Sequence, residues 1–418
     1  MNGAPHPLRL WAGTGVELEY MIVDAETLEV RPIADQLIRQ ATGTIQSDVD
    51  RGDMAWSNEL VLHLIELKTN GPVARLTGLG TRFHREIREI NGQLERFGAR
   101  LMPSGMHPWM DPKRDARLWP HEYAEVYRTY DRIFGCRSHG YANLQSMHLN
   151  LSFADDPEFG RLHAAARVLL PLLPAIAASS PFTEGRHPGW LDHRLEVYRH
   201  NADRIPAIVG SVIPEPVFSQ AAYQREILDV IYQAISPFDP AGSLQDEFLN
   251  ARGAIARFSR GSLELRLMDV QECPKADLAL AQLVVTVLQL LAGEQWSSLA
   301  DLQSTPSRPL EQVLDRTARQ ADAAILVEPL PRLFGWPGSL PCTAGELWQH
   351  LVRTALATSP FDPESTSAFE LILRQGPLAR RLFQATGPAP DRDRLRSVYR
   401  RLCECLAENR LFDSAAAG

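Results

Sequence analysis

The segment that decides the fold is residues 15–24, GVELEYMIVD, in which polar and apolar side chains alternate. Side chains of an extended strand point alternately to its two faces, so Glu17 and Glu19 share one face. The opposite face is apolar and consists of Val16, Leu18, Tyr20 and Ile22. The pattern predicts a strand with its apolar face in a core and its acidic face free for chemistry.

Two distant segments show the same alternation. Residues 146–153, SMHLNLSF, place His148 and Asn150 on a polar face, and residues 262–268, SLELRLM, place Glu264 and Arg266 on another. Three strands of this kind are typical of a sheet that is covered by helices on its apolar face only. We therefore expect an α+β fold with a mainly antiparallel sheet and helices packed on one face.

A fourth segment, residues 58–69 (NELVLHLIELKT), carries Glu59 and Glu66. Their separation of seven is odd, so an uninterrupted flat strand would point them to opposite faces. Two alternatives remain open. Either a bulge or bend interrupts the strand, or Glu59 lies in the turn before it.

Helical periodicity marks the scaffold and the end of the chain. Apolar residues recur every three or four positions in residues 83–97 and 395–405, as in amphipathic helices. The apolar segment 278–292 is too short to span a bilayer and reads as a buried helix. Proline-rich joints divide the last 118 residues, which look helical. The predicted domains are a catalytic domain at 1–300 and a helical C-terminal extension at 301–418.

Composition narrows the class of function. The formal net charge of −8 argues against binding to nucleic acid or to a membrane surface, which would need clustered positive charge. The five cysteines are scattered and lack metal-type pairs, and residues 1–10 show no secretion signal. We expect a cytoplasmic protein that acts on small molecules, and a homo-oligomer is the common expectation for such an enzyme.

The polar face of the predicted sheet would collect an unusual number of acidic groups. Carboxylates crowded together repel one another unless cations neutralise them. Oxygen ligands of this kind suit Mg²⁺ or Mn²⁺, and two or three divalent ions would balance the charge. The predicted metal ligands are Glu17, Glu19, Glu59, Glu66, His148 and Glu264. Taken singly, an acidic strand face is more often solvated and a histidine more often structural, so the combination carries the hypothesis.

The same face would hold phosphate without any of the common phosphate-binding loops. The sequence contains no G-x-x-x-x-G-K-[ST] motif, and Phe83 stands where a dinucleotide motif begun at Gly78 and Gly80 needs its third glycine. Arg266, with Arg252 or Arg257, could instead bind a transferring phosphate or an anionic substrate.

Several short motifs follow one another over about the first 290 residues. They are G-V-E-x-E-Y at 15–20, E-x6-E with a nearby Thr at 59–69, G-x-H-P at 105–108, S-P-F-x-x-G at 180–185, N-A-R at 250–252 and E-L-R-x-x-D at 264–269. In this order they resemble the second group of the glutamate-cysteine ligase family, also called carboxylate-amine ligases. The chain departs from that group in its H-x-N-x-S strand at 148–152, in Gly253 and Ala254, where a second basic residue is common, and in its C-terminal extension.

The resemblance implies a saddle-shaped antiparallel sheet, similar to that of glutamine synthetase, with Mg²⁺ and ATP on its concave face. It implies γ-phosphoryl transfer from ATP to a carboxylate, followed by attack of an amine on the acyl phosphate. The residues assigned above would bind metal, Glu264 and Arg266 would be the catalytic residues, and the nucleotide would contact Arg252, Arg257, Arg266 and Asn150. Glutamate and cysteine are the reference substrates, and another acid and amine would fit equally well.

Two other functions are compatible with the same site. One is a non-catalytic accessory protein that binds a nucleotide or metabolite. The other is a phosphotransferase that stops at the phosphorylated product. Fold resemblance by itself does not separate these functions from a ligase.

Overall fold

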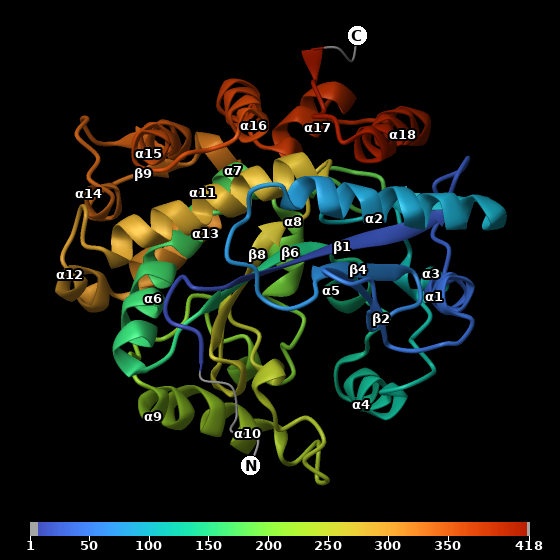
Figure 1. Ribbon diagram of the computed structural model, residues 1–418, viewed down its shortest axis with the longest axis horizontal. Helices are drawn as coiled ribbons and strands as arrows, with labels where there is room; N and C mark the ends of the chain where they lie inside the picture. Colours follow the sequence, from blue (N-terminus) through green and yellow to red (C-terminus); the bar gives the residue numbers. More distant parts are fainter. Residues whose placement is uncertain (1–6, 416–418) are drawn as a thin grey trace.

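A single antiparallel sheet organises the computed structural model, which describes residues 7–415. Every pairing in this sheet is antiparallel. Its strands lie in the spatial order β2 (Asp48–Asp50), β3 (Met54–Asn58), β4 (Leu64–Thr69), β1 (Thr14–Asp24), β6 (Ser146–Ser152), β8 (Ser262–Asp269) and β7 (Ala254–Arg257), and β5 (Ala99–Met102) also pairs with β1 (Figure 1). The expected α+β class with a mainly antiparallel sheet is confirmed.

The register of the central strands brings the acidic positions together. β1 lies between β4 and β6, with Glu19 opposite Glu66 and Glu17 opposite His148. Side chains of directly paired residues lie on the same face of a sheet. On the other face the alternate residues are fully buried, among them Val16 and Leu18. The three predicted alternating strands are confirmed as β1, β6 and β8.

Three helices cover the apolar face of the sheet. They are α2 (Leu79–Leu94), α6 (Asp156–Leu169) and α11 (Pro274–Ala292), and α11 packs against the other two. Figure 1 shows α2 and α11 side by side over the strands. By length and composition α11 could cross a membrane, but 72% of its most apolar window is buried inside the protein. It is therefore a core helix, as the sequence predicted.

Other helices lie on the opposite side of the sheet. Figure 1 shows α4 (Ala124–Phe134), α9 (Gln220–Tyr223) and α10 (Asp229–Ile235) on this side, away from α2 and α11. The remaining helices of this part are α1 (Ala34–Thr42), α3 (Pro112–Asp115), α5 (His139–Ala142), α7 (Pro174–Ala177) and α8 (His193–Tyr198).

The C-terminal part forms an outer helical layer. Its elements are α12 (Leu299–Ser304), α13 (Ser307–Gln320), β9 (Ile325–Leu326), α14 (Leu330–Leu333), β10 (Cys342–Thr343), α15 (Ala344–Thr358), α16 (Pro363–Gln375), α17 (Leu378–Thr386) and α18 (Arg392–Glu408). α16 packs on α11, and α18 packs on α2 and β5. The fully buried Arg381 places Nη1 2.6 Å from Oε1 of the equally buried Glu272. A buried ion pair thus joins this layer to the connection between β8 and α11. The domain boundary at residue 300 stays a prediction.

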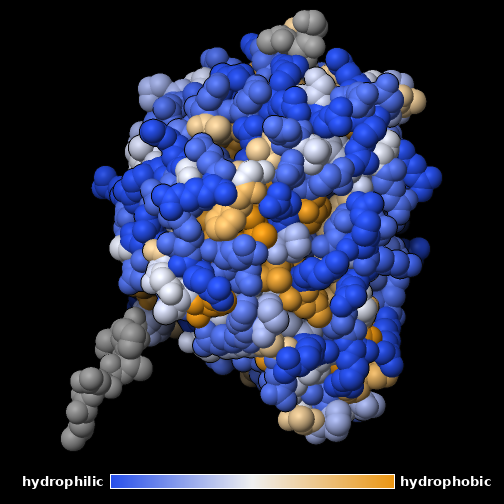
Figure 2. Space-filling view, turned by 90° about the vertical axis from the view of Figure 1, so that its right-hand side faces the viewer, coloured by the Kyte–Doolittle hydropathy of each residue, from blue (hydrophilic) through white to orange (hydrophobic). Residues whose placement is uncertain are grey.

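The molecular surface is mostly hydrophilic, with hydrophobic residues gathered near the middle of the face in Figure 2. All five cysteines are buried free thiols. Residues 1–6, part of the segment in which no secretion signal was expected, lie outside the described residues.

Candidate active site

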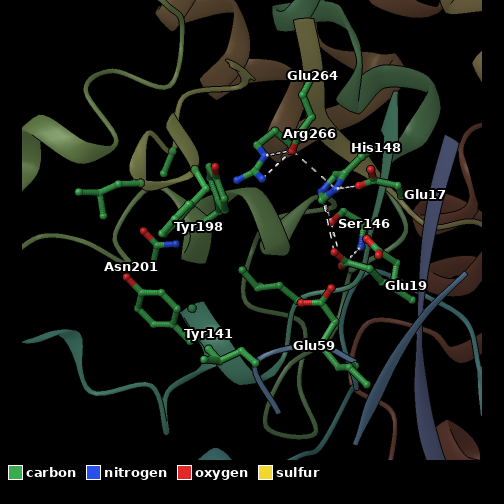
Figure 3. A pocket seen from close by; sticks show the side chains of 18 of the residues that line it. Glu17, Glu19, Glu59, Tyr141, Ser146, His148, Tyr198, Asn201, Glu264 and Arg266 are labelled. Atoms are coloured by element: carbon green, nitrogen blue, oxygen red, sulfur yellow. Dashed lines mark hydrogen bonds and ion pairs between the residues drawn. The ribbon is translucent and has the colours of Figure 1, made fainter. Parts of the chain in front are cut away.

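A cavity of about 380 Å³ opens on the polar face of the sheet. The strands supply its charged wall, and residues from α4, α5, α8 and the loop before β7 supply the facing wall. Figure 3 shows the acidic side chains and His148 on one side, with Tyr198, Asn201 and Tyr141 across the cavity. A cavity of this size is typical of a small-molecule site.

His148 links Glu17 and Glu19, two acidic residues of β1. Its Nδ1 lies 3.1 Å from Oε2 of Glu17, and its Nε2 lies 2.8 Å from Oγ of Ser146. Ser146 also donates its backbone N–H and its hydroxyl to Oε2 of Glu19, at 2.7 and 2.9 Å. Asn150 donates to the other oxygen of Glu17 at 2.9 Å. These contacts fix the orientation of both carboxylates before any ligand binds.

The structure decides between the two alternatives for Glu59 and Glu66. The segment is not one strand, because β3 ends at Asn58 and β4 begins at Leu64. Glu59 therefore lies in the connection that precedes β4, and Glu66 lies within β4. Both line the cavity, so the odd spacing does not separate them.

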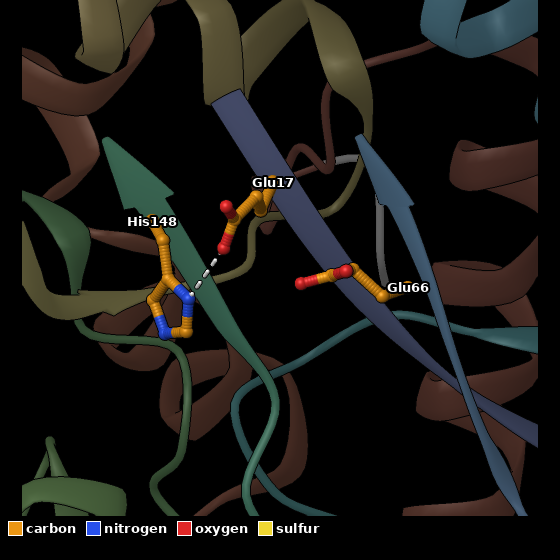
Figure 4. A group of neighbouring side chains, drawn as sticks. All are labelled: Glu17, Glu66 and His148. Carbon is orange, nitrogen blue, oxygen red and sulfur yellow. Dashed lines mark hydrogen bonds and ion pairs between the residues drawn. The ribbon is translucent and has the colours of Figure 1, made fainter. Parts of the chain in front are cut away.

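The described residues contain two groups whose ligand atoms all lie within 4.8 Å of one another. One consists of Glu17, Glu66 and His148, shown in Figure 4, and the other of Glu19, Glu59 and Glu66. Burial, with the charges of Glu19 and Glu66, raises the pKa of Glu59 well above its usual range. Burial and the charge of Glu17 raise the pKa of Glu66 to about 7. Oxygen-rich groups with uncompensated negative charge fit divalent cations.

Glu264 lies in a different electrostatic environment. Arg266 and Arg257 place nitrogens 2.6 and 3.2 Å from its two carboxylate oxygens. Burial opposes ionisation, but the charges of Arg266, His148 and Arg257 outweigh it and lower the pKa of Glu264 to about 2. Glu264 lies 4.0 Å from Nδ1 of His148, at the edge of the candidate metal groups. Its role as a metal ligand stays a prediction.

Two of the residues expected to bind the nucleotide have other partners. The guanidinium of Arg252 is held in two hydrogen bonds of 2.6 Å by Glu215, and the side chain is buried. Among residues 7–415, the cavity lining includes Arg257 and Arg266 but neither Arg252 nor Asn150. The structure therefore places Arg252 outside the cavity lining with its guanidinium paired to Glu215, and contact of Arg252 and Asn150 with a nucleotide stays a prediction. Asn150 instead orients Glu17.

Other family motifs support the site from behind. A Cβ on Gly105 would lie 2.4 Å from the carboxyl carbon of Asp269, so only glycine allows this approach. Asp269 accepts hydrogen bonds from the backbone N–H of Ser179, from the hydroxyl of Ser180 and from Nε of Arg194. Arg194 lines the cavity and donates to the backbone carbonyl of Arg266. The motifs at 105–108, 180–185 and 264–269 therefore meet at one buried carboxylate.

Several lining residues were not predicted. Lys68 follows Glu66 by two positions, so strand alternation alone could have placed it on the acidic face. The residues facing the strands come from helices and loops whose periodicity gives no sign of a site. They are Tyr130, Tyr141, Arg194, Tyr198, Asn201 and Phe248.

Comparison with known proteins places this charged antiparallel sheet in a family of ligases. The sequence-family model of glutamate-cysteine ligase family 2 matches residues 14–323. The chain therefore belongs to this family. An uncharacterized protein of Archaeoglobus fulgidus is 30% identical over 398 residues, covering 95% of this chain and 99% of its own. A Rubrobacter xylanophilus protein, whose name gives it provisionally as glutamate–cysteine ligase 2-1, is 26% identical over 74% of both chains.

The solved structures add a likeness in fold. The glutamate–cysteine ligase of Francisella tularensis, determined in complex with AMP, superposes with a TM-score of 0.57. The match covers 99% of this chain and 92% of that one at 13% sequence identity. The likeness therefore extends through the C-terminal helices, beyond the residues that the family model matches.

Proposed function

We propose that the protein is an ATP- and Mg²⁺-dependent carboxylate-amine ligase that forms an amide bond through an acyl phosphate. One observation carries the proposal: a single cavity brings an acidic cluster with His148 next to two arginines. The acidic cluster suits divalent cations, and the arginines suit phosphate oxygens. Membership of glutamate-cysteine ligase family 2 supports this assignment.

The acidic side of the cavity fits the metal. Glu17, Glu66 and His148 would hold one ion, and Glu19, Glu59 and Glu66 a second. When bound, Mg²⁺ neutralises phosphate oxygens during phosphoryl transfer. The protein groups position these ligands through Ser146 and Asn150, which already hold Glu19 and Glu17.

The arginine side fits the transferring phosphoryl group. Arg266 and Arg257 can share their donors between Glu264 and phosphate oxygens, and arginine recognises both anions well. An oxygen of the substrate carboxylate attacks the γ-phosphorus, and ADP leaves. The amine nitrogen then attacks the acyl carbon, phosphate leaves, and the nitrogen loses a proton. The side chains contribute positioning and charge, without a covalent intermediate on the enzyme.

The substrates are small molecules, with glutamate and cysteine the first pair to test. The wall opposite the strands offers both stacking and hydrogen-bonding groups, among them Tyr141, Tyr198 and Asn201. Oδ1 of Asn201 is buried without a hydrogen-bond partner among residues 7–415, so it is available to a bound donor. The buried free thiols agree with a cytoplasmic location.

The test is a product screen. The protein is incubated with Mg²⁺, ATP and a mixture of amino acids, and mass spectrometry is used to detect a dehydrated conjugate that forms together with ADP. Conjugate and ADP in equal amounts would support a ligase. A phosphorylated acid without amide would favour the phosphotransferase, and no ADP with any acid and amine tried would count against catalysis.

A further inference from the structure

Lys68 is a cation inside the acidic wall of the cavity. It lies on β4, two residues after Glu66, and directly opposite Glu17 on β1. Residues two apart on a strand and residues directly paired across strands share a face. Lys68 therefore belongs to the same wall as the two carboxylates, and it lines the cavity with them.

The ammonium group of Lys68 contacts one particular oxygen of Glu66. Its Nζ lies 3.2 Å from Oε2 of Glu66, 2.9 Å from Oδ1 of Asp48 and 3.0 Å from Oγ of Ser57. Ser57, which pairs with Glu66 across the sheet, donates its hydroxyl to the same Oε2. Two donors thus hold Oε2, whereas Oε1 has no hydrogen bond to residues 7–415.

Glu66 is the carboxylate that both candidate metal groups share. A side chain that fixes the orientation of Glu66 therefore affects both candidate metal groups. Lys68 is also the only lysine or arginine within ion-pair distance of Glu66 among the described residues. Arg257 and Arg266 are paired with Glu264 instead.

We propose that Lys68 is a positioning residue and built-in counter-cation of the candidate metal centre. It holds Oε2 of Glu66, stabilises the metal-free cluster, and lowers the affinity of that cluster for divalent cations. The cluster therefore keeps its geometry without metal and releases metal readily. The proposal rests on the metal site proposed above, but not on the ligase reaction.

The direction of the effect follows from charge. A unit positive charge within a few ångströms of a divalent ion repels it, and in a partly buried site this repulsion is only weakly screened. Removing it should make Mn²⁺ bind about tenfold more tightly or more. It should also lower the melting temperature of the metal-free protein, because the carboxylates lose their counter-ion.

The experiment measures Mn²⁺ binding to the full chain by titration calorimetry for wild type, Lys68→Met and Lys68→Arg. Lys113→Met is the matched control, since Lys113 is exposed and lies outside this cavity. Lys68→Met should bind Mn²⁺ about tenfold more tightly and melt lower without metal. Lys68→Arg and Lys113→Met should bind within about twofold of wild type.

An unchanged or weaker Mn²⁺ affinity in folded Lys68→Met would overturn the role of Lys68 while leaving the metal site intact. Absence of Mn²⁺ binding in wild type would overturn both. If Lys68→Met does not fold, Lys68→Gln keeps a hydrogen-bond donor to Glu66 without the charge. The same tightening of Mn²⁺ binding is then expected, and its absence would contradict the proposal.

Discussion

Two buried carboxylates of the same cavity, Glu264 and Glu66, have opposite electrostatic environments. Glu264 lies against two arginines, and its pKa is lowered to about 2. Glu66 lies among other carboxylates, and burial raises its pKa to about 7 even though Lys68 contacts it. Neighbouring cations thus compensate the negative charge of Glu264 fully and that of Glu66 only in part.

The difference divides the cavity by chemistry. The incompletely compensated side attracts further positive charge, which fits divalent metal. The side with Arg257 and Arg266 carries donors that can move from Glu264 to phosphate oxygens. Phosphoryl transfer needs both sides of the cavity, because metal and arginines would stabilise different parts of the negative charge on the transferring phosphoryl group.

The largest effect is expected from Glu19→Gln, on the metal side. The change keeps the size of the side chain but weakens a ligand of the second metal group. ATP turnover, measured as ADP release, should fall by about 10²–10³-fold or more with the circular dichroism spectrum unchanged. Glu89→Gln, at an exposed position of α2, is the control. Turnover within a few fold of wild type would remove Glu19 from the site.

A loss of about 10²-fold is expected from Arg266→Met, on the phosphate side. Here the effect should appear in kcat, since Arg266 is proposed to contact the transferring group. Mn²⁺ affinity should change much less than it does in Glu19→Gln. An equal loss of Mn²⁺ binding in both variants would erase the distinction between the two sides.

Opposite pH dependences should follow from the two pKa shifts. Between about pH 4.5 and 7 the folded metal-free protein binds more protons at Glu66 than the unfolded chain does. Its free energy of unfolding should therefore fall by up to about 3 kcal/mol as the pH rises through this window. Glu264, with a lowered pKa, stabilises the fold above about pH 4.5 and loses this contribution as the pH falls toward 2.

Thermal melts in chelator between pH 4.5 and 7.5 measure this dependence. Glu66→Gln should flatten the decline, and Mg²⁺ should restore stability at pH 7.5. A decline that is the same in wild type and Glu66→Gln would show that Glu66 is not its source.

The smallest effect is expected from Arg252→Lys and concerns the KM for ATP. Because Glu215 already occupies its guanidinium, the KM for ATP should stay within about twofold of wild type. Arg257→Lys should raise that KM by about tenfold, since lysine does not reproduce the arginine fork. A larger change in KM for Arg252→Lys than for Arg257→Lys would show that Arg252, and not Arg257, contacts ATP.

The sequence predicted the central sheet well for a physical reason. Strand alternation is local, so β1, β6 and β8 could be recognised from their own residues, including Glu17, His148 and Glu264. The ion-pair partner of a side chain, by contrast, can lie far away in the sequence. Nothing in the N-A-R motif at 250–252 shows that Arg252 pairs with Glu215, 37 residues away.

The facing wall of the cavity was not predictable in the same way. Tyr141 and Tyr198 come from short helices, and Asn201 from the loop after α8, and only tertiary packing brings them opposite the strands. Glu59 illustrates an intermediate case. Its spacing from Glu66 left two geometries open, and the break between β3 and β4 decided between them.

In the proposed reaction, ATP activates a carboxylate as an acyl phosphate before an amine attacks. This activation is tested most directly by labelling both carboxylate oxygens of the acid substrate with ¹⁸O and analysing the released phosphate by mass spectrometry. The acyl phosphate predicts transfer of one ¹⁸O to each phosphate formed. Amide formation that releases phosphate without ¹⁸O would rule out an acyl phosphate intermediate.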